Sequence, residues 1–184
     1  MNQTVQLASI HRLVWTGLLA SLTAVGAAIA VPLGPLSPVP VTLQGLFVLL
    51  CGLILGARGG SIAILLYMAA GCLGLPVFAG GKAGLAVFLG PTGGFLLGFL
   101  AQAFFAGLGG GKPAKPFRWV LLCCLMGTSI MLAMGALRLM FVMDVSLAKA
   151  LAVGVTPFLP GDILKCLAAS AIYRFLGSRG LLPT

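Results

Sequence analysis

The chain has 184 residues, of which 60% are hydrophobic and only 7% are charged, and its mean hydropathy is +1.18. Because a soluble domain carries about 25% charged residues, this composition excludes an ordinary soluble fold and indicates a single domain, residues 1–184, surrounded by lipid. The net charge of +9 comes from basic residues scattered singly between apolar runs, a pattern that fits orientation in a membrane better than binding to nucleic acid.

The first half of the chain predicts three membrane helices. Residues 13–31 form an apolar run that is too long for the apolar region of a signal peptide, so we expect a helix there. Prolines then exclude a continued helix; they are Pro32, Pro35, Pro38 and Pro40. Beyond them we expect a short helix at 42–55 and another at 61–75, with a tight turn at 56–60 between them.

The second half predicts three more helices, after a glycine-rich stretch that ends at residue 94. We expect these helices at 93–107, 119–143 and 160–176, with a basic loop at 109–118. A short segment, 147–158, is expected to be helical and partly inserted. The prediction is therefore an all-α, polytopic membrane protein with about six transmembrane helices in one bundle.

The distribution of basic residues predicts the orientation of this bundle. With six helices, one side collects seven basic residues, namely Arg12, Arg58, Lys112, Lys115, Arg118, Arg174 and Arg179. The other side collects three, namely Lys82, Lys149 and Lys165. Since Lys and Arg favour the cytoplasm, both termini should be cytoplasmic. The outer segments are rich in Pro, Gly, Thr and Gln, and irregular backbone at membrane depth indicates a cavity that opens outward.

Two ionisable residues at the start of the last predicted helix form the strongest candidate site. Asp162 and Lys165 are spaced i,i+3, so they lie on one face of the first turn. One interpretation is a helix cap with a local ion pair. The other is a pair that binds a ligand near the outer surface, because ionisable groups in membrane helices are costly and are usually functional.

The outer loops supply further candidate binding residues. Lys82 is either an exposed cation or a group that attracts a ligand anion, and neighbouring glycines, including Gly80, permit close approach of backbone to a small molecule. Gln44 both donates and accepts hydrogen bonds, which suits an amide or urea group. The alternative is that Thr42 caps a helix and Gln44 makes a loop contact. The glycine-rich stretch lacks the Gly-Lys-Ser/Thr sequence that ends a phosphate-binding loop, so nucleotide binding is not expected.

Small residues recur on the first predicted helix at four-residue spacing, at Ala20, Ala24 and Ala28. Such a stripe lets a second helix approach closely, either within this chain or from a partner subunit. The isolated Arg138 is expected to pair with Asp144 or to extend towards a membrane surface. The five cysteines form no metal-binding pattern and are expected to pack as small hydrophobic residues.

Catalysis is not expected. The chain has one histidine, His11, ahead of the first predicted helix, and it has no glutamate. Its two acids, Asp144 and Asp162, do not fit the shared-proton arrangement of an aspartyl protease.

Four motifs, in matching order over nearly the whole chain, resemble the BioY family. They are VPVTLQ at 39–44, GLPVFAGG at 74–81, LGPTGG at 89–94 and PFLPGDILK at 157–165. This family comprises biotin-specific substrate-binding subunits, or S components, of energy-coupling factor (ECF) transporters. The resemblance implies a six-helix subunit of the cell membrane that binds biotin from outside, without a cofactor. It also implies partners, which are a transmembrane coupling subunit and cytoplasmic ATPases that use the ATP.

The resemblance also suggests roles for the candidate residues. Asp162 would accept hydrogen bonds from the ureido N–H groups of biotin, with Thr42 or Gln44 completing that end. Lys165 or Lys82 would meet the carboxylate, unless Asp162 holds Lys165. The residues proposed to face the apolar rings are Phe78, Phe88 or Leu159, and those proposed to meet the coupling subunit are Ala20, Ala24 and Ala28. The alternatives are an S component for another vitamin, and a small channel or scaffold that binds no ligand.

Overall fold

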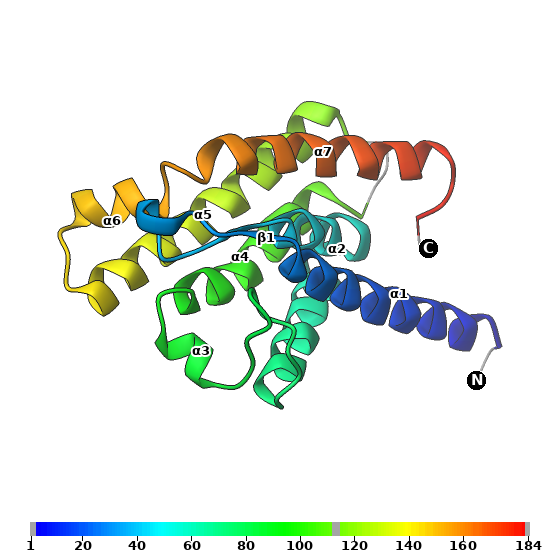
Figure 1. The fold of residues 1–184 in the computed structure, drawn as a ribbon. Coiled ribbons are helices and arrows are strands. Elements are labelled where there is room, and N and C mark those ends of the chain that lie inside the picture. The colour runs from blue at the N-terminus through cyan, green and yellow to red at the C-terminus, as the bar shows by residue number, and fades with distance from the viewer. Residues whose placement is uncertain (1–2, 112–114, 183–184) are drawn as a thin grey trace.

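The computed structural model describes residues 3–111 and 115–182, and almost all of its regular structure is helical (Figure 1). The helices are α1 Gln3–Ala28, α2 Gln44–Cys72, α3 Ala86–Leu89, α4 Gly93–Gly109, α5 Phe117–Met143, α6 Leu147–Gly154 and α7 Leu159–Ser178. A 3-10 turn, η1 Gly34–Leu36, and two short strands, β1 Ala30–Val31 and β2 Val41–Thr42, lie between α1 and α2. Helices α1 and α5 are long and apolar enough to cross a membrane, and α6 with α7 forms a bent pair that also qualifies. Helix α2 is equally apolar but is interrupted at Gly56.

Helix α2 folds back on itself at Gly56. This glycine has φ 75° and ψ 173°, which interrupts the helix. A Cβ atom added to Gly60 would lie 2.6 Å from the Cα atom of Gly52, so the chain returns along its own path. The segment is therefore a hairpin of two legs, 44–55 and 57–72, in agreement with the predicted pair of helices. The predicted turn at 56–60 was too long, because the helix is interrupted only at Gly56 and the second leg begins at residue 57. The first leg is about 18 Å long at 1.5 Å per residue.

Small residues allow α2 and α4 to pack with their backbones in contact. A Cβ atom on Gly52 would lie 2.1 Å from the carbonyl oxygen of Ala103, and one on Gly107 would lie 2.3 Å from the backbone nitrogen of Ala57. No larger residue fits at these positions without moving a helix. This close approach fixes the hairpin against α4, which in turn packs along α5.

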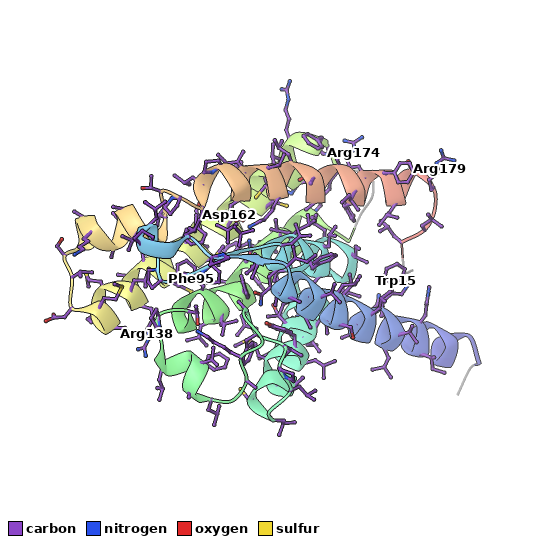
Figure 2. The ribbon with its side chains drawn as sticks, in the orientation of Figure 1. Trp15, Phe95, Arg138, Asp162, Arg174 and Arg179 are labelled. Atoms are coloured by element: carbon purple, nitrogen blue, oxygen red, sulfur yellow. The ribbon has the colours of Figure 1, made fainter. Side chains whose placement is uncertain are left out.

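The two chain ends lie at the same end of the bundle, while η1, α3 and α6 lie towards the opposite end (Figure 1). The side chains of Trp15, Arg174 and Arg179 are at the first end, and Asp162 and Arg138 lie away from it (Figure 2). Two of the seven basic residues assigned to one side, Arg174 and Arg179, therefore lie at one end of the bundle, and the orientation in the membrane stays a prediction.

Several predicted boundaries were wrong. Helix α1 ends at Ala28, because the chain then forms the antiparallel ladder in which Ala30 pairs with Thr42 and Val31 with Val41. The segment 147–158 contains helix α6 only as far as Gly154, and α7 then departs at a bend of 53°. Helix α2 stops at Cys72, three residues short of the prediction, and α5 begins two residues early, at Phe117.

The isolated arginine does not pair with an acid. The guanidinium of Arg138 donates to the carbonyl oxygen of Leu89, the last residue of α3, and not to Asp144. Asp144 instead ends α5 in the left-handed conformation, with φ 49°. The prediction for the cysteines is confirmed, since all are free and each is buried or half-buried; they are Cys51, Cys72, Cys123, Cys124 and Cys166.

Candidate ligand pocket

A pocket lies among the loop before α2, the loop after α2, and the helices α4, α5 and α7. Its empty volume is about 620 Å³, including the part that is open to the outside. It is lined by Val39, Pro40, Thr42, Gln44, Gly45, Phe78, Ala79, Val87, Thr92, Phe95, Leu96, Phe99, Met131, Leu132, Phe158, Asp162 and Lys165. Two of these residues, Asp162 on α7 and Phe95 on α4, are labelled in Figure 2. Most of the lining is apolar, and its polar groups come from few residues.

Aromatic rings form the apolar walls. The rings of Phe95 and Phe158 lie 5.9 Å apart between centroids, at a tilt of 38°. Elsewhere in the lining, Phe78 makes edge contacts with Tyr67 at 5.6 Å and with Phe88 at 5.7 Å between ring centroids. Phe78 reaches this position because it packs on Gly71, where a Cβ atom would lie 2.2 Å from its ring. The walls are therefore held by packing on both sides.

The charged groups of the pocket are Asp162 and Lys165, and they form an ion pair. Lys165 Nζ donates to Asp162 Oδ1 at 2.7 Å, and the side chains are 7% exposed for the aspartate and 13% exposed for the lysine. Both lie in the first turns of α7, where the helix dipole favours the carboxylate. The pair has no net charge, so the pocket offers strong hydrogen-bonding groups without a fixed excess of either sign.

A relay of hydrogen bonds holds the amide of Gln44 at the pocket wall. Gln44 Nε2 donates to the Tyr67 hydroxyl at 2.6 Å, and that hydroxyl donates to the carbonyl oxygen of Val77 at 3.0 Å. The Thr42 hydroxyl approaches Gln44 Oε1 at 3.5 Å, the limit of a hydrogen bond. Thr42 does not cap the helix, because the N-cap of α2 is Leu43 and it makes no side-chain cap bond. The predicted alternative of capping by Thr42 was wrong.

The structure brings together most of the residues predicted for the site. The pocket contains Thr42, Gln44, Phe78, Asp162 and Lys165. These residues come from three parts of the chain that are distant in sequence.

Four other candidates lie outside the pocket lining. Phe88 packs behind Phe78 and supports it. Leu159 is 42% exposed and points elsewhere. Gly80 and Lys82 are exposed in a tight turn, in which Phe78 N donates to the carbonyl oxygen of Lys82 at 3.1 Å. Lys82 borders shallow outer grooves together with Thr92, so it is a rim residue.

Sequence reasoning missed most of the apolar lining. The residues that it did not select are Val39, Pro40, Gly45, Ala79, Val87, Thr92, Phe95, Leu96, Phe99, Met131, Leu132 and Phe158. The i,i+4 spacing of Phe95 and Phe99 places them on one helix face, which was available as a signal. From the sequence alone that face looks like ordinary helix core, because the cavity is formed only together with residues of α5 and α7.

The sequence profile of the BioY family matches residues 1–180. A biotin transporter BioY of Thermotoga maritima is 40% identical over 163 residues, which cover 89% of this chain and 94% of the relative. A probable biotin transporter BioY of Pyrococcus horikoshii is 44% identical over 155 residues, which cover 84% of this chain and 89% of the relative.

A solved structure has the same fold. It is the crystal structure of the S-component for biotin from an ECF-type ABC transporter, with a TM-score of 0.86 and 26% sequence identity. The superposition covers 97% of this chain and 95% of the other. The similarity therefore extends to every helix that contributes to the pocket.

Proposed function

This chain belongs to the BioY family, and we propose on that premise that it binds biotin from outside the cell and serves its uptake as the S component of an ECF transporter. It is a multi-pass protein of the cell membrane. The observation that carries the proposal is the neutral ion pair of Asp162 and Lys165, set among aromatic walls in one pocket.

Biotin has three parts, a ureido group, an apolar bicycle with its chain, and a carboxylate. The pocket matches the chemistry of the first two. A ureido group is planar and neutral, and it suits the Asp162 carboxylate, which retains a second oxygen to accept from N–H. The amide of Gln44 also lines the pocket, and its Oε1 is a further acceptor. The apolar bicycle would lie between Phe78 and the rings of Phe95 and Phe158. Each charge-assisted hydrogen bond would contribute about 1.5–3 kcal/mol.

The carboxylate of biotin would then face the rim, where Lys82 is exposed. Lys165 is already paired with Asp162, so Lys82, which has no ion-pair partner among the described residues, is the natural partner for the acid. Gly80, in the same turn, leaves the backbone open to the ligand chain. This orientation places the neutral end of biotin deep and its charged end at the surface.

The membrane arrangement that we propose has six spans, with both legs of α2 counted separately and both termini in the cytoplasm. The asymmetry of the basic residues supports it. The pocket end would face outward, where biotin arrives.

We further propose that the chain works with a transmembrane coupling subunit and ATPases, as an S component rather than as an enzyme, and without a cofactor of its own. Helix α1 is the proposed docking element. The burial of its alanine stripe decreases along the helix: Ala20 is buried, Ala24 is half-buried and Ala28 is exposed. Docking would therefore use Ala24 and Ala28, with Ala20 packed within the chain.

Calorimetric titration of the purified chain with biotin tests the ligand. We expect saturable binding of biotin, and weaker binding of biotinamide, in which an amide replaces the carboxylate. Lys82→Gln should lower affinity for biotin and leave affinity for biotinamide unchanged. Competition by riboflavin or thiamine would support an S component for another vitamin, and a complete lack of binding would support a channel or scaffold.

A further inference from the structure

A second hollow lies at the opposite end of the molecule from the ligand pocket. It is lined by α1, by the turn of the α2 hairpin and by Gly111, which lies two residues beyond the end of α4. Its residues are Arg12, Thr16, Ile54, Leu55, Gly56, Ala57, Arg58, Gly59, Ile62 and Gly111. We call it the hairpin groove. It shares no residue with the ligand pocket.

The hairpin groove contains two guanidinium groups and no acid. Arg12 comes from α1 and Arg58 from the second leg of α2. Neither forms an ion pair or a side-chain hydrogen bond with any residue in 3–111 or 115–182. The acids of the whole chain are Asp144 and Asp162, of which the second is paired in the other pocket. The groove therefore has a positive charge that no residue in the described part of the chain neutralises.

Neighbouring residues place the groove at the level of lipid head groups. Trp15 lies one turn along α1 from Arg12, and its indole N–H donates to His11 Nε2 at 3.0 Å. Tryptophan with a polar partner is typical of the boundary between water and hydrocarbon. The same end of the bundle carries Arg174 and Arg179 (Figure 2). Phosphate groups of lipids occupy this depth.

The other half of the groove is apolar and continues into the membrane face. Ile62 is 57% exposed, and Leu65 and Leu66 follow it as exposed residues on the same leg of α2. Their i,i+3 and i,i+4 spacing places all three on one helix face. A molecule with its anion between the two arginines would find an apolar track directly beside it.

We propose that the hairpin groove binds an anionic phospholipid, with the phosphate between Arg12 and Arg58 and an acyl chain along Ile62 and Leu66. Guanidinium groups bind phosphate with paired, charge-assisted hydrogen bonds. Basic pockets between membrane helices on the cytoplasmic side are typical sites for anionic head groups. A free phosphate or an acidic peptide would use the arginines but would leave the apolar track unused, which is why the lipid is favoured.

Lipid binding to the purified full-length chain tests this proposal. The chain is reconstituted in neutral nanodiscs and titrated with phosphatidylglycerol, with phosphatidylcholine and with inorganic phosphate, and bound lipid is counted by native mass spectrometry. We expect phosphatidylglycerol to bind preferentially. The double variant Arg12→Gln/Arg58→Gln should lower that affinity by about tenfold or more, equal to about 1.4 kcal/mol.

Arg174→Gln is the matched control. Arg174 is a cation at the same end of the bundle, but it does not line the groove. The variant should leave the binding of phosphatidylglycerol unchanged. Equal loss in the control, equal binding of the two lipids, or full displacement by inorganic phosphate would each overturn the proposal. Biotin titration of every variant shows separately whether the ligand pocket is intact, so a failure of the proposed function is distinguishable from a failure of the lipid site.

Discussion

Gln44 Nε2 and the Tyr67 hydroxyl lie 2.6 Å apart, although 23 positions separate the two residues in sequence. In one straight helix that separation would be about 35 Å. The contact therefore closes the α2 hairpin at the end away from Gly56. It also joins the hairpin to the pocket, because the same hydroxyl donates to Val77, beside the wall residue Phe78.

Tyr67→Phe tests this closure. The variant keeps the ring that packs on Phe78 but removes the acceptor for Gln44 and the donor for Val77. Because both partners are within the bundle, we expect a loss of about 1–3 kcal/mol in stability and weaker biotin binding. Thermal unfolding in detergent and calorimetry measure the two effects. Unchanged values for both would show that the relay does not position Gln44.

Asp162→Asn tests the acceptor proposed for the ureido group. The variant removes the charge from the hydrogen bonds to the ligand, which should weaken biotin binding by about 1.5–3 kcal/mol, or roughly ten- to 150-fold. Calorimetry measures the loss. Asp144→Asn is the matched control, because that acid ends α5 far from the pocket lining, in a left-handed conformation that asparagine also tolerates. A loss of similar size in the control would contradict the assignment.

Lys165→Met tests the ion pair itself. It leaves the carboxylate of Asp162 nearly buried without its cation, and breaking a buried pair costs about 3–5 kcal/mol. The double variant Asp162→Asn/Lys165→Met removes both charges and should regain much of the lost stability. Unfolding temperatures of the single and double variants provide the measurement. If the double variant is no more stable than Lys165→Met, the two side chains do not depend on each other.

Gly71→Ala tests the support behind Phe78. The added methyl group would lie 2.2 Å from the Phe78 ring, so the ring must move into the pocket and biotin affinity should fall. Gly161→Ala serves as the control, since a Cβ atom there meets nothing within 4 Å, although the residue adjoins Asp162. Calorimetry on both variants compares the effects. Equal affinities in the two variants would mean that the position of Phe78 does not matter for binding.

Sequence reasoning located most of the polar groups of the pocket, but of its apolar lining only Phe78. Asp162 and Lys165 were predictable because charges are rare in this chain and their spacing fixes a common face. Phe99 and Met131 were not, because apolar residues on α4 and α5 look alike whether they face a cavity or a neighbouring helix. Only the tertiary arrangement separates the two cases. The membership of Lys82 in the rim could not be predicted either, since it depends on how the turn after Phe78 closes.

The helices were predictable to within a few residues where proline or glycine interrupts an apolar run. Gly56 marks such a break, and both legs of α2 were expected. The end of α1 was not, because nothing in residues 29–31 forbids a helix; the strand pairing of Ala30 with Thr42 decides it. That pairing joins segments on either side of four prolines, and such a contact cannot be predicted from the conformational preferences of neighbouring residues.

The ion pair between Asp162 and Lys165 has an electrical consequence for transport. Moving one elementary charge through the membrane field costs or yields about 2.3 kcal/mol per 100 mV. Since these two charges cancel within 2.7 Å, any tilting of the subunit carries no net charge of the pair through the voltage drop. The ion pair itself is therefore nearly insensitive to the membrane potential, and voltage would act on Lys82 and on the biotin carboxylate that neutralises it.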